Sequence, residues 1–237
     1  MIVQVYLTPG ETVDTEVRGK TAVVIDVLRA TTSIAYAQTH GAEKLIPVAS
    51  IESATRLAAT LDRATTILCG ERDGKRIDGF QLGNSPSEFT PETVAGKTLI
   101  MTTTNGTETI LRFEGAREIV VCSFVNITAV ARYVRDEPEV HVACSGRMGR
   151  FSIEDAVCAG LLVARLREFG RGPLEMNDAA SATEALWRVH QSDVLRCLME
   201  ASHGRFLLDL GLGDDIAVCA RVDALTTVPV VREGRIA

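Results

Sequence analysis

An acid, an arginine and a run of hydroxyl residues follow an apolar stretch near the start of the chain. The segment is Val24-Ile25-Asp26-Val27-Leu28-Arg29-Ala30-Thr31-Thr32-Ser33. A carboxylate at the carboxyl end of a buried strand is able to hold a metal ion or attack phosphorus, so Asp26 is a candidate for either role. The guanidinium of Arg29 suits phosphate, sulfonate or carboxylate oxygens. Because a helix is predicted to follow, its free N–H groups should point to the same anion-handling site.

A second cluster of polar residues and glycines follows a later apolar stretch. The sequence Cys69-Gly70-Glu71-Arg72-Asp73-Gly74 leads into a long loop that ends in Gly83-Asn84-Ser85-Pro86. So many glycines in one loop indicate that backbone must approach a ligand closely. Glu71 is a candidate metal ligand and Arg72 a candidate anion-binding residue. A surface ion pair in a glycine-rich turn is the alternative.

The turn Thr102-Thr103-Thr104-Asn105-Gly106-Thr107 places hydroxyl groups, an amide and a glycine between a predicted strand and a predicted helix. A helix start of this kind suits phosphate, so Thr104, Asn105 and Gly106 are candidate substrate-binding residues. Ordinary helix capping by the same residues is the alternative. Asn126, in a similar position after another strand, is predicted to be a helix cap.

The segment Val142-Ala143-Cys144-Ser145-Gly146-Arg147-Met148-Gly149-Arg150-Phe151-Ser152 allows two interpretations. In the first, Cys144 and Arg150 have the Cys-x5-Arg spacing of thiol phosphatases, and Cys144 is the nucleophile in a loop that wraps phosphate. Against this, no histidine stands directly before Cys144, and Phe151 replaces the hydroxyl residue usual after the arginine.

In the second interpretation the same loop only cradles an anion, and an acid from the next helix contributes to a metal site. Ser145 and Gly146 then contact the substrate, while Glu154 or Asp155 helps to bind Mg²⁺, which prefers a few carboxylates together with water and substrate phosphate. Neighbouring helix residues point about 100° apart, so only one of these acids need face the site. Helix capping by Ser152 and the acids is the alternative.

The other titratable residues show no comparable pattern. The histidines share no spacing and are predicted to be structural or solvent-facing: His40, His141, His190 and His203. Asp214-Asp215 is typical of ordinary acids at a helix start. The sequence contains no Walker A motif, which disfavours nucleotide hydrolysis.

Apolar, β-branched runs alternate with stretches of helical periodicity along most of the chain. This alternation predicts an α/β fold in which helices cover a mostly parallel sheet. The longest predicted helix spans Ile153–Phe169. The predicted strands are Val3–Leu7, Ala22–Val27, Lys44–Val48, Thr66–Cys69, Thr98–Met101, Ile119–Cys122 and Val140–Ala143.

The pattern changes after Phe169, where helical stretches follow one another. They predict a helical C-terminal portion, so we expect a single domain over residues 1–237 with a small helical lobe at 174–225. The last apolar run, Thr227-Val228-Pro229-Val230-Val231, is predicted to be an edge strand, because proline has no N–H group to donate to a central ladder.

Composition limits the classes of function. Lys and Arg number 25 against 31 Asp and Glu, and the net charge of −6 argues against nucleic acid or an anionic membrane as a partner. The 6 cysteines are scattered without zinc spacing, which indicates reduced thiols in a cytoplasmic protein. No apolar run has the length of a membrane span. We therefore expect a small anionic substrate that is captured by local positive charge.

Taken together, the motifs resemble the 2-phosphosulfolactate phosphatase family from about Ile2 to Asp223. The resemblance implies Mg²⁺-dependent hydrolysis of (R)-2-phospho-3-sulfolactate to 3-sulfolactate and phosphate, a step of coenzyme M biosynthesis. Related phosphorylated 2-hydroxy acids are alternative substrates. The motifs that carry the resemblance, in order, are Val24–Thr32, Gly70-Glu71-Arg72, Gly79-Phe80-x-x-Gly83-Asn84-Ser85-Pro86, Thr102–Thr107 and Cys144-x-Gly146-x-x-Gly149-x-x-Ile153-Glu154-Asp155.

The hypothesis from the sequence is a phosphomonoesterase in which Mg²⁺ bridges Asp26, a second acid and the substrate phosphate. Glu154 is the first choice for the second acid, and Glu71 or Asp155 is the next. The nucleophile is Asp26, Cys144 or a water molecule.

Substrate oxygens would be neutralised by Arg29 and Arg72, with hydrogen-bond donors from 104–106 and 145–146 completing the cradle. Two alternatives use parts of the same set. One is a non-catalytic sensor or carrier of phosphorylated or sulfonated acids, and the other is a metal-independent cysteine phosphatase that uses Cys144. Enzymes of this size commonly self-associate, so a homodimer is expected.

Overall fold

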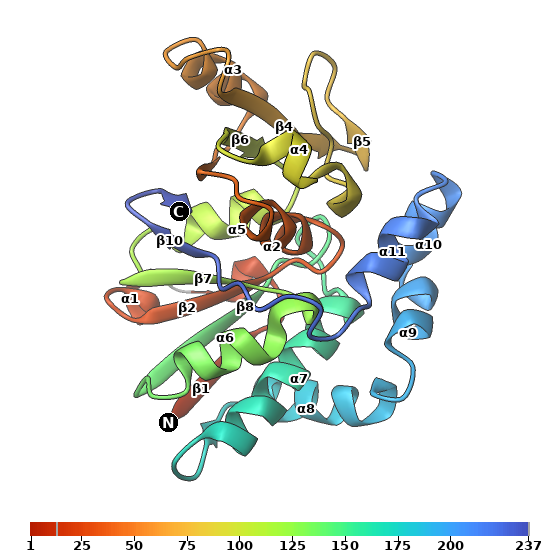
Figure 1. The fold of residues 1–237 in the computed structure, drawn as a ribbon. Helices are drawn as coiled ribbons and strands as arrows, with labels where there is room; N and C mark the ends of the chain where they lie inside the picture. The colour runs from red at the N-terminus through yellow and green to blue at the C-terminus, as the bar shows by residue number, and fades with distance from the viewer. Residues whose placement is uncertain (13, 237) are drawn as a thin grey trace.

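One large β-sheet forms the centre of the computed structural model, which describes residues 1–12 and 14–236 (Figure 1). The strand order is β5-β4-β6-β3-β11-β10-β7-β2-β8-β1-β9, and most neighbouring strands are parallel. The predicted α/β class with a mostly parallel sheet is therefore confirmed. The strands are β1 (Ile2–Tyr6), β2 (Thr21–Ile25), β3 (Lys44–Pro47), β4 (Thr66–Arg72), β5 (Lys75–Arg76), β6 (Thr98–Thr102), β7 (Glu118–Cys122), β8 (Glu139–Cys144), β9 (Glu175–Met176), β10 (Val230–Arg232) and β11 (Arg235–Ile236).

Helices connect the strands and continue into the C-terminal part. The longest, α7, has the bounds that the sequence predicts. The α-helices are α1 (Asp14–Val17), α2 (Ala30–Thr39), α3 (Ile51–Ala58), α4 (Pro91–Val94), α5 (Gly106–Arg112), α6 (Ile127–Val134), α7 (Ile153–Phe169), α8 (Asp178–His190), α9 (Val194–Glu200), α10 (Ser202–Asp209) and α11 (Gly213–Cys219). Short 3-10 helices are η1 (Pro9–Glu11), η2 (Pro86–Glu88) and η3 (Phe124–Asn126). Within the described residues, no helix is both long and apolar enough to cross a bilayer.

The two faces of the sheet bury separate apolar clusters. Successive strand residues point to opposite faces. Val23 and Ile25 of β2 accordingly pack in the cluster with α6 and α7, whereas Ala22 and Val24 pack in the cluster with α2 and the end of α5. Because both faces of β2 are covered, residues Ala22–Ile25 form an unbroken apolar run, and the chain turns polar again where the strand ends, at Asp26.

The C-terminal hairpin is not at an edge of the sheet, so the prediction of an edge strand was wrong. β10 pairs with β7, and β11 pairs with β3, both antiparallel, so the hairpin joins two parallel halves of the sheet. Pro229 lies just before β10, and its carbonyl oxygen accepts a hydrogen bond from the N–H of Val121 at 2.8 Å. At this position the residue only has to accept a hydrogen bond through its carbonyl oxygen, so the missing N–H of proline does not weaken the sheet.

The C-terminal helices lie together beside one end of the sheet (Figure 1). Helix α8 packs closely on α7, where a Cβ atom at Gly160 would lie 1.9 Å from the carbonyl oxygen of Thr183. From this base α9, α10 and α11 extend to the carboxyl ends of the strands. This path brings residues after position 200 next to residues near position 26.

Candidate active site

A pocket lies at the carboxyl ends of the parallel strands, where open α/β sheets usually bind ligands. It collects residues that follow β2, β4, β6 and β8, together with residues of α10. Its lining consists of Asp26, Leu28, Arg29, Glu71, Asp73, Gly74, Asn84, Thr103, Thr104, Asn105, Arg147, Met148, His203 and Phe206. The sequence segments singled out for their polar residues therefore do meet in one place.

Asp26 is the buried carboxylate of this pocket, with 6% of its surface exposed. Burial raises its pKa to about 6, and the negative charges of Glu71 and Glu154 act in the same direction, while His203 opposes them. A Cβ atom at Gly106 would lie 2.6 Å from Oδ2 of Asp26, so only glycine fits there. Gly106 thus lies at the site as predicted, where its lack of a side chain makes room for Asp26.

Glu71 connects two loops around the pocket. Its Oε1 accepts a hydrogen bond from the N–H of Thr104, and its Oε2 accepts one from the N–H of Gly74, each at 2.8 Å. The side chain is buried, so Glu71 is not part of a surface ion pair. Since both oxygens are in use, the carboxylate positions the loops after β4 and β6.

Arg29 is held by the protein itself. Its Nη1 donates to Oδ2 of Asp215 at 2.5 Å, and its Nη2 donates to the carbonyl oxygen of Gly74 at 2.8 Å. Ser85 donates to the other oxygen of Asp215. The interpretation of Asp215 as an ordinary helix-start acid was therefore wrong, because it is a buried counter-ion that fixes Arg29 at the pocket wall.

Arg72 is not among the lining residues. Its guanidinium donates to the carbonyl oxygen of Glu71 at 2.7 Å and to Oγ1 of Thr102 at 2.9 Å, which supports the end of β6. The arginine that shares the pocket with Arg29 is instead Arg147, from the loop after β8. Arg147 belongs to the segment considered in the sequence analysis, but the Cys-x5-Arg spacing pointed to Arg150 as the functional arginine.

The loop after β6 lines the pocket as predicted. The hydroxyl of Thr104 is buried there without a hydrogen-bond partner within the described chain. Asn105 also faces the pocket, and its Oδ1 accepts a hydrogen bond from the N–H of Met148 at 3.0 Å. Asn105 therefore joins this loop to the loop after β8.

Ser145 and Gly146 use their backbone N–H groups internally, so these groups do not form the predicted anion cradle. The N–H of Ser145 donates to the carbonyl oxygen of Ile25, and that of Gly146 donates to Oδ2 of Asp155. The other oxygen of Asp155 accepts from the N–H of Val27 at 2.8 Å. Asp155 consequently fastens the end of β2 to the end of β8, and does not face the pocket.

Glu154 is the acid of this pair that approaches the site. It is 2% exposed, and its Oε1 lies 3.5 Å from Nδ1 of His203. Burial acts to raise its pKa, but His203 and Ser152 together outweigh burial and hold the pKa below its usual range. Oε1 has no hydrogen-bond partner among the described residues.

His203 was predicted to be structural or solvent-facing, and this prediction was wrong. Its side chain is 14% exposed and lines the pocket together with Asp26. Nothing in the local sequence of α10 indicates this role. Only the path of the C-terminal helices brings His203 to the carboxyl end of β2.

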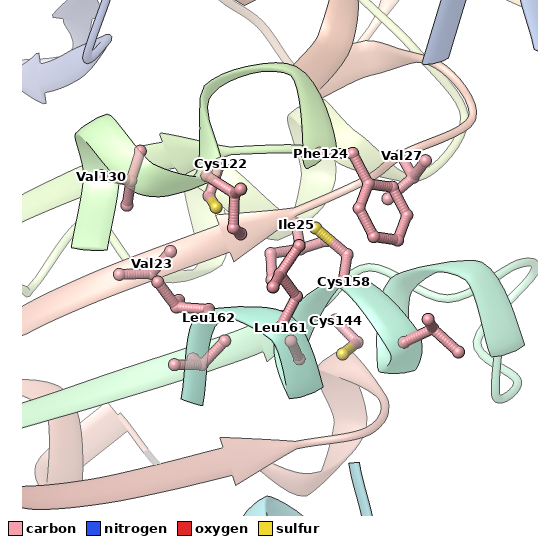
Figure 2. Close-up of a cluster of buried hydrophobic side chains, with 14 of the residues drawn as sticks. Val23, Ile25, Val27, Cys122, Phe124, Val130, Cys144, Cys158, Leu161 and Leu162 are labelled. Carbon is pink, nitrogen blue, oxygen red and sulfur yellow. The ribbon is translucent and has the colours of Figure 1, made fainter. Parts of the chain in front are cut away.

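Cys144 lies in the apolar core, not in the pocket. Figure 2 shows its sulfur among apolar side chains of the sheet and α7, near Cys158 and Leu161. Its surface is fully buried, and burial raises the pKa of the thiol well above its usual range. A protonated, enclosed thiol is neither reactive nor accessible. The interpretation of Cys144 as the nucleophile of a thiol phosphatase was therefore wrong.

Seven buried side-chain polar atoms of the described residues have no hydrogen-bond partner, and three of them lie at the pocket or at the groove that adjoins it. These three are Oδ1 of Asn84, Oγ1 of Thr104 and Oε1 of Glu154. Buried polar groups in folded proteins nearly always have a hydrogen-bond partner, so a group of unpaired atoms at a pocket indicates a ligand or ion that pairs with them. Residues 1–12 and 14–236 contain no cluster of three or more His, Cys, Asp or Glu side chains arranged to hold a metal ion alone.

Comparison with known proteins identifies the family. A family model described as 2-phosphosulpholactate phosphatase matches residues 6–234. The chain belongs to the 2-phosphosulfolactate phosphatase family. The resemblance of the sequence motifs is thereby confirmed, and so is the prediction of a phosphoric monoester hydrolase, the enzyme class of the 2-phosphosulfolactate phosphatases.

Relatives of the same name align over most of the chain. A protein of Caldanaerobacter subterraneus subsp. tengcongensis named "Probable 2-phosphosulfolactate phosphatase" is 37% identical over 235 residues, which cover 99% of this chain and 97% of the relative. Relatives with the same name are 40% identical in a Cyanothece species, with 98% and 97% covered, and 44% identical in Parasynechococcus marenigrum, with 88% and 87% covered.

The Arg29–Asp215 pair can be tested by replacing Asp215 with Asn. We expect the free energy of unfolding to fall by about 3 kcal/mol or more, because the Arg29 guanidinium would stay buried without a counter-ion. Urea unfolding measures the change. The exposed neighbour Asp214 provides a matched control, and Asp214→Asn should change stability by less than about 0.5 kcal/mol. Equal effects of the two substitutions would contradict the assigned pair.

The raised pKa of Asp26 predicts a pH-dependent cost of folding. Between its ordinary pKa of 3.8 and its folded value of about 6, the folded protein binds a proton that the unfolded chain releases. Stability is therefore lost as pH rises through this window. In EDTA at about pH 8, Asp26→Asn should be more stable than the wild type by roughly 1–3 kcal/mol, and the difference should shrink below about pH 4. Urea unfolding of both proteins at the two pH values measures this.

The control for this measurement is Asp73→Asn, which removes an exposed carboxylate from the rim of the same pocket. Asp73→Asn should show no such difference between the two pH values. If Asp26→Asn were less stable than the wild type at the higher pH, burial of an ionised Asp26 would not be the cost that we assign to it.

Proposed function

We propose that this chain hydrolyses 2-phospho-3-sulfolactate, or a closely related phosphorylated 2-hydroxy acid, to the free hydroxy acid and phosphate, and that it does so with Mg²⁺. The observation that carries the proposal is the pocket itself. A buried carboxylate with a raised pKa, Asp26, shares one pocket with arginine, histidine and hydroxyl groups, in a chain of the 2-phosphosulfolactate phosphatase family.

The acids at the site fit a magnesium ion. Asp26 and Glu154 are both buried, and the charge of Glu154 contributes to the raised pKa of Asp26. A cation would remove this repulsion and would give Oε1 of Glu154 the partner that it lacks. One or two carboxylates are the usual protein share of a Mg²⁺ site, with water and phosphate completing it. When bound, the ion polarises phosphoryl oxygens and offsets their negative charge.

The remaining polar groups of the pocket bind and orient the substrate. Phosphoryl oxygens accept a hydrogen bond from the unpaired hydroxyl of Thr104, and Arg29 forms part of the pocket wall. These groups are fixed before the substrate arrives, because Glu71 and Asp215 hold the backbone and the guanidinium in place. Such preorganised charge is generally the largest part of phosphoryl-transfer catalysis.

His203 supplies the proton that the reaction requires. Hydrolysis breaks the bond between phosphorus and the C2 oxygen of the substrate, and an oxygen from water becomes the fourth phosphate oxygen. The departing C2 oxygen takes a proton from His203, and water restores that proton in the next cycle. Oε1 of Glu154 lies 3.5 Å from Nδ1 of His203, so the acid and the imidazole border the same part of the site.

Release of phosphate tests the proposal directly. We expect the purified protein to release phosphate from 2-phospho-3-sulfolactate in Mg²⁺ and to lose that activity in EDTA, because the acidic site needs a cation to accept an anionic substrate. A malachite green assay with a panel of phosphorylated 2-hydroxy acids measures both points. Full activity in EDTA would contradict the magnesium site, and binding without release would favour the sensor or carrier.

Substitutions test whether the reaction requires Asp26 or Cys144. We expect Asp26→Asn to reduce kcat roughly 1,000-fold or more, because the central carboxylate takes part in the reaction as a metal ligand or as the nucleophile. Cys144→Ser should retain kcat within a few-fold, since the thiol lies in the core. Steady-state kinetics on folded variants gives both values. An active Asp26→Asn, or an inactive but folded Cys144→Ser, would overturn the assignment.

A further inference from the structure

Arg147 has a position that the reaction at the phosphate does not require. Its guanidinium carbon lies 4.3 Å from the centre of the Phe206 ring, and the side chain is half-buried. No carboxylate among the described residues forms an ion pair with it, and its side chain donates no hydrogen bond to them. A planar guanidinium stacked on an aromatic ring keeps its N–H edge available.

The other arginines near the site do not offer comparable donors. Arg29 uses Nη1 for Asp215 and Nη2 for Gly74, and Arg72 uses both of its Nη groups on the ends of β4 and β6. Of the two arginines that line the pocket, Arg147 is the one whose guanidinium stays uncommitted within the described chain.

The loop that carries Arg147 is held firmly. The N–H of Arg147 donates to the carbonyl oxygen of Arg150 at 2.9 Å, and the N–H of Arg150 donates back at 3.0 Å. Gly146 allows the turn, because its φ is 61° and a Cβ atom there would lie 2.2 Å from the carbonyl oxygen of Arg150. Asn105 fixes Met148 in the same loop. The guanidinium is thus presented by a constrained loop.

Phe206 sets the place of Arg147 relative to the reaction. It lies one helical turn after His203 on α10, and their rings are 6.3 Å apart. Arg147 therefore lies beside the proton-supplying residue and at the mouth of a groove that continues along Ser152 and Ile153. A substrate whose phosphate sits near Asp26 would extend its remaining groups toward this mouth.

We propose that Arg147, stacked on Phe206, binds the acidic group of the substrate that does not react, a sulfonate or a carboxylate. Arg147 is then the residue that restricts the enzyme to phosphate esters that carry a further anion. This inference rests on the proposed function, since it names the substrate class of the same pocket.

The test compares three substrates in the wild type and in Arg147→Gln. They are 2-phospho-3-sulfolactate, 2-phospholactate, which lacks the sulfonate, and isopropyl phosphate, which lacks both acids. We expect Arg147→Gln to lower kcat/KM by roughly 10- to 100-fold for an ester with the recognised anion, the loss typical of a charged hydrogen bond, and by only a few-fold for isopropyl phosphate. The loss should appear mainly in KM.

The pattern of kcat/KM losses across the three substrates identifies the anion that Arg147 binds. A loss confined to 2-phospho-3-sulfolactate assigns Arg147 to the sulfonate, and an equal loss on it and 2-phospholactate assigns Arg147 to the carboxylate. An equal loss on all three substrates, or no loss on any, would overturn the inference. Arg150→Gln is the matched control, because it removes the same charge from an exposed position of the same loop and should leave the ratios unchanged.

A binding measurement keeps this inference separate from the proposed activity. Calorimetry with 3-sulfolactate and with lactate reports recognition of the acids without any hydrolysis. Weaker binding to Arg147→Gln, together with a wild type that releases no phosphate, would retain the anion site and reject the phosphatase. Phosphate release by the wild type, with unchanged binding and unchanged kcat/KM in Arg147→Gln, would retain the phosphatase and reject the anion site. Phe206→Leu should weaken binding in the same direction, because it removes the platform.

Discussion

The buried carboxylate of Asp26 is the constraint on which the rest of the site depends. An acid at a strand end, enclosed and close to Glu71 and Glu154, is unfavourable in isolation, and its raised pKa reflects that cost. The neighbouring acids Glu71, Asp155 and Asp215 are bonded within the protein and do not present a free carboxylate to the pocket. Glu71 and Asp155 each accept two backbone N–H groups, and Asp215 is neutralised by Arg29. Asp26 keeps an uncompensated charge in a pocket, which is a property of functional sites more than of structural ones.

The site can hold these groups only because the end of the chain returns to its beginning. The C-terminal hairpin closes the sheet between β3 and β7, and the segment before it runs along η3, where the N–H of Leu225 donates to the carbonyl oxygen of Val125. Helices α10 and α11, which pack on each other and on α9, place His203 at the pocket and Asp215 beside Arg29. The pocket is therefore complete only when the C-terminal part is folded in place.

The sequence predicted those parts of the structure that depend on local pattern. Continuous apolar strands, the helix at Ile153–Phe169 and the polar turns after β2, β4 and β6 all follow from periodicity and turn chemistry. It could not predict which hydrogen-bond donors and acceptors the protein would use internally. Arg29, Gly146 and Asp155 look available in one dimension, yet each is bonded to a partner that is distant in sequence. The roles of His203 and Asp215 were missed for the same reason. The edge-strand prediction failed because Pro229 contributes its carbonyl oxygen, not an N–H group, to the sheet.

The way arginines are used explains how an acidic protein can attract an anionic substrate. With a net charge of −6, the overall field repels polyanions, so capture must come from charges that are close and not already neutralised. Arg29 is neutralised by Asp215, so it shapes the pocket more than it attracts ligand. Arg147 is paired with an aromatic ring in place of a carboxylate, which holds the guanidinium in position without cancelling its charge. If Asp26 and Glu154 bind Mg²⁺ as proposed, a positive group of this kind beside them gives a site in which the metal and the polyanion each improve binding of the other.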